Sequence, residues 1–364
     1  MIGEIHRMSA RLDNRYELVA GAMSVDPAVA RETAELCLVD PERSYEDYRD
    51  MAEAEAARED GVEVVTIATP PHLHAEIATL FMERGIDVIC EKPMTRTLEE
   101  AVDLKQSVTR SGRIFALTHC YTGYPMVREA RALVKKGAIG AVRQVECDFP
   151  SGPFLVEEPQ RDKRHWRFRP EFMGVDAILG EIGTHAYQMA HFVSGRLPVA
   201  LSAHMSVLTP GRETFDDAHI VLKYEDGALG RMWLSFVAAG NEHGLAFHIY
   251  GTEGSLKWHQ ERPDQLWLQH AAEPARRLTP GHPDRMTPEG FHACRLREGH
   301  PDGYVLAFAN LYRDFADIFF ARALGRSGAT PYAHFPTVED GVDTMRFYAA
   351  AAKSNAQAGA WIEL

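Results

Sequence analysis

Short apolar runs alternate with amphipathic stretches from Tyr16 to about His119. Four runs predict strands, at 17–23, 62–68, 86–90 and 114–118, because they are short, rich in β-branched residues and without polar alternation. The stretches between them predict helices at 27–36, 45–58, 74–84 and 98–111. This alternation predicts a doubly wound α/β domain, whose parallel sheet is buried between helices.

The pattern changes after about Tyr121. A helix is predicted at 125–136, and the later runs alternate between apolar and polar residues, at 142–149, 220–224, 229–236, 245–250 and 255–259. Two pairs of these runs flank glycine-containing turns and predict hairpins of a mostly antiparallel sheet. Helices are predicted at about 185–195, 304–324 and 338–358, and the segment 274–301 is predicted to be a long loop. We therefore expect domains at 1–120 and 121–364, the second of the α+β type.

The first domain lacks the usual beginning of a dinucleotide-binding fold. Such a fold opens with a strand, a glycine-rich turn and a helix, but the sequence has no G-x-G-x-x-G and starts with Met1-Ile2-Gly3 and an amphipathic stretch. Without a first strand, two central strands would be left with unpaired backbone, at about 1–3 kcal/mol for each buried group. We expect a domain that is incomplete at its N-terminus, through a late start codon or truncation, with Gly3 as a remnant of the turn. The alternative is a domain that never bound a nucleotide.

Composition narrows the class of protein. The formal net charge of −13 disfavours binding to nucleic acid or to an anionic membrane surface. Five scattered cysteines without a C-x-x-C pair suggest neither a disulfide framework nor a thiolate zinc site, and fit a reducing cytoplasm. No apolar run approaches the ~18 residues of a membrane span. We expect a cytoplasmic protein.

Two motifs follow predicted strands at the edge where open α/β sheets bind ligands. Glu91-Lys92-Pro93 comes directly after the run 86–90, and a lysine there can hold a hydroxyl group; the alternative is a simple Glu91–Lys92 pair on a loop. Thr69-Pro70-Pro71-His72-Leu73-His74 ends the run 62–68. His72 and His74 straddle a helix start, so capping or packing is favoured over metal binding, and no metal site is predicted.

A third motif, Gly180-Glu181-Ile182-Gly183-Thr184-His185, opens the helix predicted to end at Gly195. On a continuous helix Glu181 and His185 share one face, so the carboxylate can orient the imidazole. A histidine held by an acid can remove a proton from an alcohol. The alternative is a satisfied core histidine.

In this order the three motifs resemble the glucose-fructose oxidoreductase and inositol dehydrogenase family, Gfo/Idh/MocA, from Ile2 to the C-terminus. Ile249-Tyr250-Gly251-Thr252-Glu253-Gly254 and Thr337-Val338-Glu339-Asp340-Gly341 add to the resemblance. It implies a Rossmann-type NAD(P) domain, a second domain with a large antiparallel sheet, and oxidation or reduction of a sugar-like carbinol. The implied activity is that of an NAD(P)-dependent oxidoreductase acting on a sugar, sugar acid or cyclitol.

The resemblance also implies roles for single residues. Lys92 would orient the substrate hydroxyl beside the nicotinamide, with a cis peptide before Pro93, and His185 would be the general acid/base. Glu181 stands where the family has an aspartate. In the family, the position of Ser24 selects between NAD and NADP. A serine does not repel the phosphate of NADP and carries no positive charge to bind it, so the cofactor is NAD or NADP. The predicted cofactor-binding residues are Gly3, Ser24, Thr69, Pro70, His74, Glu91 and Lys92.

Some departures from the family pattern bear on activity. Pro71 replaces an asparagine, Glu181 is one methylene longer than aspartate, and Gln188 replaces an acid. Together with the missing glycine turn they keep open an alternative function, a non-enzymatic protein that senses a sugar or dinucleotide on the same fold. A metal hydrolase is a weaker alternative, because no H-E-x-x-H spacing occurs.

The substrate is expected to be a polyhydroxylated ring. Aromatic side chains stack on the C–H face of such a ring, while hydroxyl, amide and guanidinium groups bond its hydroxyls. We expect the Lys92 ammonium and the His185 imidazole to meet in a crevice between the domains, and the uncovered sheet face to form a homodimer or homotetramer. The predicted substrate-binding residues are Tyr121, Trp166, Arg167, Asn241 and His300.

Overall fold

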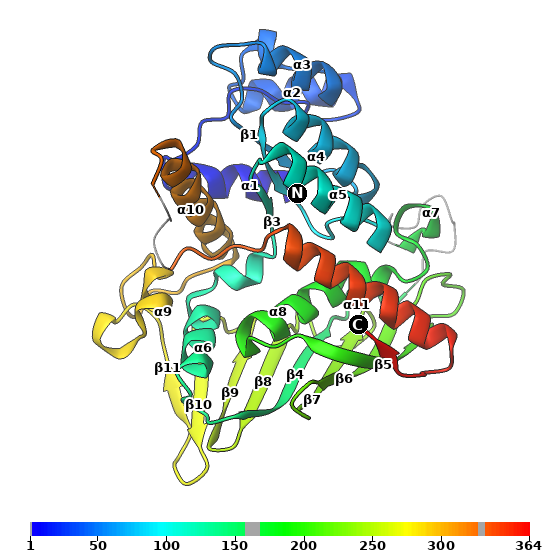
Figure 1. Cartoon of the computed structure of the whole chain (residues 1–364), viewed down its shortest axis with the longest axis vertical. Helices are drawn as coiled ribbons and strands as arrows, with labels where there is room; N and C mark the ends of the chain where they lie inside the picture. Colours follow the sequence, from blue (N-terminus) through cyan, green and yellow to red (C-terminus); the bar gives the residue numbers. More distant parts are fainter. Residues whose placement is uncertain (1, 157–167, 327–331) are drawn as a thin grey trace. The chain divides into compact units, whose positions relative to one another are not determined.

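The computed structural model describes residues 2–156, 168–326 and 332–364 (Figure 1). The chain divides into two compact units. The first consists of Met1–Thr95, Glu99–Thr118 and Leu311–Val342, and the second of Arg96–Leu98, His119–Asn310 and Asp343–Leu364. A C-terminal segment therefore belongs to the N-terminal unit.

The first unit is built on a parallel sheet in the order β1-β2-β3. β1 is Val64–Ile67, β2 is Asp87–Cys90 and β3 is Phe115–Leu117. All of β2 is buried, which confirms the parallel sheet predicted from uniformly apolar runs. The helices of this region are α1 (Ile2–Arg11), α2 (Pro27–Leu36), α3 (Tyr48–Ala56), α4 (His74–Glu83) and α5 (Leu98–Ser111), with short 3-10 turns at Pro41–Arg43 and Pro71–Leu73.

The strand predicted at 17–23 is wrong. In the structure this segment makes only an isolated parallel bridge, between Gly21 and Ser44. A strand needs a neighbour to bond its backbone, and within the described residues β1 pairs with β2 alone. Thr66 of β1 is consequently exposed, although it lies in a parallel sheet. Within 17–23 only Ala20 and Gly21 are buried, and no partner strand for the segment lies among the described residues.

The second unit is built on a sheet with the strand order β11-β10-β9-β8-β4-β7-β6-β5-β12. Only β4 and β7 are parallel; the other neighbours are antiparallel, as predicted. Both predicted hairpins are confirmed, and Gly227 supplies the positive φ of +83° in the β6–β7 turn. The strands are β4 (Val142–Pro150), β5 (Pro198–Ser206), β6 (Asp217–Tyr224), β7 (Leu229–Ser235), β8 (Ala246–Gly251), β9 (Gly254–His259), β10 (Leu266–His270), β11 (Arg276–Leu278) and β12 (Ile362–Glu363).

Helices cover one face of this sheet (Figure 1). They include α6 (Pro125–Lys135), α8 (Thr184–Ser194) and the end of α11 (Val338–Ala356), where Ser354 and Asn355 accept hydrogen bonds from the backbone of β5. Burial alternates along β6, so that His219, Val221 and Lys223 are exposed on the other face. The remaining helices are α7 (Pro170–Met173), α9 (Pro288–His292) and α10 (Tyr304–Ala323), with 3-10 turns at Cys120–Gly123 and Pro283–Arg285 and a π-helix at Leu179–Gly183.

The segment 274–301 is not the unstructured loop predicted from its composition. It contains β11, a 3-10 turn and α9. Thr287 caps α9 through the backbone N–H of Gly290, and the buried Glu129 carboxylate accepts from both the backbone and the hydroxyl of Thr287. Pro288 at the first helical position signals this helix, but the partner that fixes the cap is 158 residues away in the sequence.

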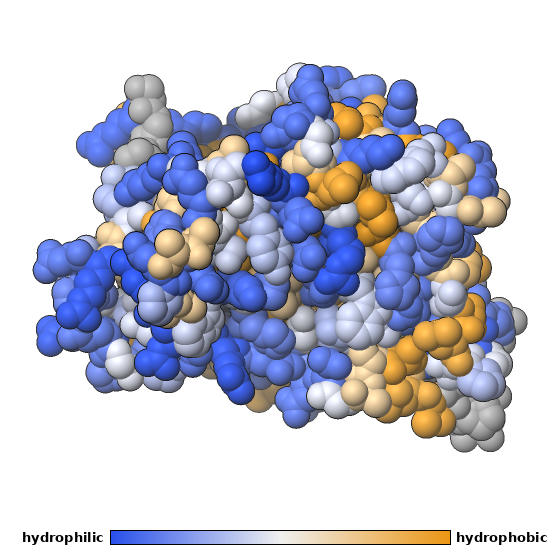
Figure 2. Space-filling model, turned by 90° about the horizontal axis from the view of Figure 1, so that it is seen from below, coloured by the Kyte–Doolittle hydropathy of each residue, from blue (hydrophilic) through white to orange (hydrophobic). Residues whose placement is uncertain are grey.

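The surface seen in Figure 2 is mostly hydrophilic, with hydrophobic residues gathered in patches on the right-hand side of that view. This agrees with the charged composition of the chain. Over residues 2–156, 168–326 and 332–364, no helix has both the length and the apolar character that crossing a bilayer requires.

Candidate active site

The Glu91-Lys92-Pro93 turn lies at the carboxyl edge of the parallel sheet, as predicted. The backbone N–H of Glu91 bonds Ile67 at the end of β1, and that of Thr118 bonds Cys90 at the end of β2. The peptide between Lys92 and Pro93 is cis, as the resemblance implied. Three strand ends therefore bring Glu91, Lys92 and Thr118 to one edge.

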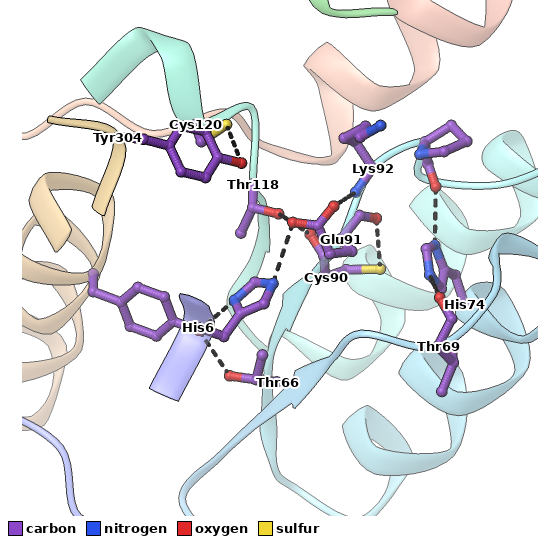
Figure 3. A network of polar contacts seen from close by, with 12 residues as sticks. His6, Thr66, Thr69, His74, Cys90, Glu91, Lys92, Thr118, Cys120 and Tyr304 are labelled. Atoms are coloured by element: carbon purple, nitrogen blue, oxygen red, sulfur yellow. Dashed lines mark hydrogen bonds and ion pairs between the residues drawn. The ribbon is translucent and has the colours of Figure 1, made fainter. Parts of the chain in front are cut away.

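The Glu91 carboxylate is buried, with 6% of the residue exposed, and both of its oxygens are engaged. Oε1 accepts from the Thr118 hydroxyl (2.6 Å) and from Nε2 of His6 (3.2 Å), and Oε2 accepts from the backbone N–H of Lys92 (3.1 Å). Figure 3 shows His6 pointing at this carboxylate. Burial alone would raise the pKa of Glu91, but the hydrogen bond and charge of His6, with Lys92 and Thr118, lower it to about 2. Glu91 is a carboxylate at any physiological pH.

The ring of His74 lies between two turns at this edge of the sheet. Its Nδ1 lies 2.9 Å from the carbonyl of Pro93 and its Nε2 lies 2.8 Å from the carbonyl of Thr69. Burial lowers the pKa of His74, although the two carbonyls oppose that shift. A neutral imidazole has one N–H, so His74 donates to one of the two carbonyls and lies against the other, which places its ring between Thr69 and Pro93. The packing role favoured for this histidine over metal binding fits this geometry.

The Thr69 hydroxyl has a different environment. It is buried without a hydrogen-bond partner in the described part of the chain, at the end of β1. A buried hydroxyl without a partner costs free energy, so it marks a place where a ligand can donate or accept. Pro70 beside it is exposed, and Pro71 is buried at the position where an asparagine was expected.

Ser24 and Gly3 lie at the starts of two helices. The Ser24 hydroxyl accepts from the backbone N–H of Asp26, whose carboxylate caps α2. Gly3 lies in the first turn of α1, and a Cβ there would meet only the tip of Arg7 at an ordinary 3.6 Å. Sterics within the chain do not require glycine at position 3.

His185 lies in the second unit, at the start of α8, and the segment before it differs from the prediction. Glu181 and His185 were expected on one face of a continuous α-helix, but Glu181 lies in the π-helix Leu179–Gly183. The wider π turn changes the register between the two residues, and π segments occur frequently at functional sites. Gly183 makes the close approach possible, because a Cβ there would lie 3.0 Å from Leu234 of β7. The helix ends at Gly195, as predicted.

Aromatic rings surround the buried His185. Tyr121 and His119 stand edge-on to it, at 4.7 Å and 5.7 Å between ring centroids, and Phe149 is tilted against it at 6.3 Å. The Tyr121 hydroxyl lies 2.6 Å from Nε2 of His243. Tyr121, predicted to bind substrate, therefore lies directly against His185. His119 and Phe149 were not predicted, although each ends a predicted strand, which is the signal that could have identified them.

The other predicted substrate residues have different surroundings. The Asn241 amide donates within its own turn, to the carbonyl of Ala238, and His300 is exposed in a turn with Nδ1 near the carbonyl of Glu298. Neither shares a contact described here with the cluster around His185. Trp166 and Arg167 lie outside the described residues.

Residues 1–119 match the family profile described as "Oxidoreductase family, NAD-binding Rossmann fold", and residues 127–257 match that of the GFO/IDH/MocA C-terminal domain. The chain belongs to the GFO/IDH/MocA oxidoreductase family.

Several relatives span the whole chain or most of it. The uncharacterized oxidoreductase YfiI of Bacillus subtilis is 31% identical, covering 100% of this chain and 93% of that protein. Levoglucosan dehydrogenase of Pseudarthrobacter phenanthrenivorans is 28% identical over 83% of this chain and 79% of its own length. The structure of an inositol dehydrogenase homologue from Azotobacter vinelandii with NADH and myo-inositol is 32% identical, with a TM-score of 0.92 over 100% of this chain and 94% of that one. The resemblance read from the three motifs is confirmed.

The residues at the sheet edge would suit the nicotinamide end of a dinucleotide, because the Thr69 hydroxyl is buried without a partner in the described part of the chain and the Glu91 carboxylate and the Lys92 turn lie at the same edge. The N-terminus of α1 at Gly3 would be the element that receives the pyrophosphate, although the sequence has no G-x-G-x-x-G turn. No group of three or more metal-ligating side chains is placed to hold a metal ion in the part of the chain that is described.

Proposed function

We propose that the protein is an NAD(P)-dependent dehydrogenase or reductase that acts on a ring CH–OH group of a sugar, sugar acid or cyclitol. The observation that carries the proposal is the environment of His185, a buried imidazole enclosed by aromatic rings at a π-to-α helix junction. A low-dielectric environment of this kind keeps an imidazole poised to exchange a proton with an alcohol.

The surroundings of His185 suit a polyhydroxylated ring better than an apolar ketone. Tyr121 and Phe149 offer ring faces and edges for the C–H surface of a sugar, while the Tyr121–His243 pair offers polar atoms for hydroxyls. Cyclitol and anhydrosugar relatives support this substrate class. The proposed substrate residues on the described part of the chain are Tyr121, Asn241 and His300, with Trp166 and Arg167 added from the sequence.

Two polar groups carry the proposed reaction, and each stands in one of the motifs found in the sequence. Lys92 donates a hydrogen bond to the substrate hydroxyl and so stabilises its oxygen as the proton leaves, while His185 accepts that proton. We propose that Glu181 orients the His185 ring from the π turn that precedes α8, instead of from the same face of a continuous α-helix. The nicotinamide, when bound, accepts or donates the hydride. Thr69, Pro70, Glu91 and Lys92 hold the cofactor at the sheet edge, and Ser24 leaves the choice between NAD and NADP open.

The test measures reduced nicotinamide by absorbance over a panel that includes myo-inositol, levoglucosan and simple aldoses, with each dinucleotide. We expect turnover of at least one polyol, and a loss of about 100-fold or more in His185→Ala. His191→Ala is the matched control, because His191 lies on the same helix and its Nδ1 faces the carbonyl of Arg196. Polyol binding without any absorbance change over the whole panel would contradict the proposal and favour a sensing protein.

A further inference from the structure

The side chain of His6 lies between Glu91, which the proposed function uses, and Tyr312, which it does not use. Its Nε2 donates to Glu91, and its Nδ1 lies 2.8 Å from the hydroxyl of Tyr312 on α10. His6 is 2% exposed and Tyr312 is 2% exposed. The two residues are 306 positions apart in the sequence, yet both belong to the first unit. α1 and α10 are thus joined beneath the Glu91-Lys92 turn.

The hydrogen bonds continue beyond Tyr312, and each side chain from Glu91 to Thr66 in this network has a partner. The Tyr312 hydroxyl lies 3.1 Å from that of Thr66 on β1. If His6 is neutral, Tyr312 donates to it and Thr66 donates to Tyr312; if His6 is charged, both bonds run in the opposite direction. In either state Nε2–H points at Glu91. The carboxylate keeps its hydrogen bond from His6 regardless of the direction of the other bonds.

We propose that His6 and Tyr312 are positioning residues, which hold the Glu91 carboxylate against the backbone N–H of Lys92 and thereby fix the lysine for catalysis. This inference rests on the proposed function, in which Lys92 binds the substrate hydroxyl. Glu91 has only two oxygens, and Oε1 is held by His6 and Thr118 while Oε2 receives the Lys92 N–H. Releasing Oε1 lets the carboxylate rotate and removes the fixed acceptor from the Lys92 turn.

The alternative is that the network only stabilises the fold. A buried ionised carboxylate needs hydrogen-bond donors in any case, and losing one destabilises the protein whether or not catalysis depends on it. Stability measurements therefore cannot distinguish the two roles. A positioning role predicts that a variant changes both the surroundings of the Lys92 amine and the rate of the chemical step. A role in stability alone predicts neither change.

Tyr312→Phe is the main variant, because it removes one hydroxyl and keeps the buried ring. Tyr16→Phe is its matched control: Tyr16 packs edge-on against Tyr312 at 5.3 Å and donates to the Tyr312 carbonyl, but has no contact with His6 or Glu91 among those described. His6→Gln is the second variant, because it replaces the rigid ring, whose two nitrogens bridge Glu91 and Tyr312, by a flexible amide.

The experiment has two readouts. In steady-state kinetics with the best polyol, we expect Tyr312→Phe and His6→Gln to lower kcat by about fivefold to tenfold with KM within twofold, and Tyr16→Phe to match the wild type. In NMR spectra of the reductively 13C-methylated protein, the Lys92 resonance, assigned by its loss in Lys92→Arg, is expected to shift in the first two variants and not in Tyr16→Phe.

Unchanged kcat and an unchanged Lys92 resonance in both variants would overturn the inference, and so would equal effects in Tyr16→Phe. If the wild type turns over no polyol, the proposed function fails on its own. The Lys92 resonance then decides whether His6 and Tyr312 position this lysine, because that readout needs neither cofactor nor substrate.

Discussion

The hydroxyl of Tyr121 lies 2.6 Å from Nε2 of His243, while the ring of the same tyrosine stands edge-on to His185. Tyr121 is buried and His243 is exposed, so the pair joins the interior around His185 to the solvent side. His243 is itself held through its backbone N–H by Glu261 and packs edge-on against Phe149 at 4.8 Å. Tyr121 is therefore held by its hydroxyl, which contacts His243, and by its ring, which packs against His185.

Tyr121→Phe should keep the packing against His185 and lose the hydrogen bond to His243. A hydrogen bond of this kind contributes about 0.5–1.5 kcal/mol, so we expect kcat/KM for the polyol to fall by about threefold to tenfold. Tyr250→Phe is the control, because Tyr250 makes a comparable bond to Nδ1 of His248 on the same strand, β8. Equal kinetics in the two variants would show that the Tyr121–His243 bond has no part in substrate binding.

Glu91 makes folding stability depend on acid pH. Its pKa in the folded state is about 2, below the ordinary value of 4.5, so folding favours the ionised form. The resulting stabilisation, about 3 kcal/mol at most, is complete above about pH 4.5 and is lost as the pH falls towards 2. In urea unfolding, the difference in free energy between wild type and Glu91→Gln should be largest near neutral pH and shrink below pH 4.5. A difference that stays constant from pH 7 to pH 3 would contradict the assigned ionisation.

Arg43 and Glu55 form a second buried pair in the first unit. The Arg43 guanidinium donates to both carboxylate oxygens of Glu55, which also accept from the Tyr45 hydroxyl and the backbone N–H of Val62. Arg43→Met leaves this carboxylate buried without its counter-ion and should lower the free energy of unfolding by about 3–5 kcal/mol. The double variant with Glu55→Leu should be more stable than Arg43→Met alone. Chemical denaturation of the three proteins measures this, and a double variant less stable than the single one would refute the argument.

Local signals in the sequence predicted those elements whose determinants are local. The bounds of α2 agree with the prediction because Asp26 caps it and Pro27 occupies its first position. The hairpin at Gly227 agrees because the turn needs its positive φ. The strand predicted at 17–23 failed because a strand depends on a distant partner. β5, β10 and β12 were not predicted for the same reason. Each of them forms by pairing with other strands of the sheet, and that pairing cannot be read from its own residues.

The residues of the candidate site also differ in whether their determinants are local in the sequence. Lys92 and His185 were identifiable because each stands in a motif at a strand end or helix start. His6 was not, because its importance comes from Glu91 and Tyr312, which are 85 and 306 residues away. The π turn at Glu181 was hidden because the i to i+4 spacing looks the same in a regular helix.

The uncovered face of the large sheet is the basis of the last prediction. Val221, Leu229 and Trp267 project from it with 43%, 48% and 42% of their surfaces exposed. On the same face, Arg231 bonds both Glu146 and Asp148. Exposed apolar side chains among neutralised charges are typical of a surface that associates. We propose that two copies of the chain pack through this face.

An interface of this kind needs about 800 Å² from each partner, and a new charge near its centre should disrupt it. Val221→Arg places a second cation directly opposite Arg231, the cross-strand partner of Val221. In sedimentation equilibrium we expect the wild type to be a dimer or tetramer at micromolar concentration and Val221→Arg to dissociate at least tenfold more readily. Leu36→Glu is the control, because Leu36 is 76% exposed and lies on α2, which is not part of the unit that contains this sheet. A wild type that stays monomeric at every concentration would refute the proposed association, as would a Leu36→Glu variant that dissociates as readily as Val221→Arg.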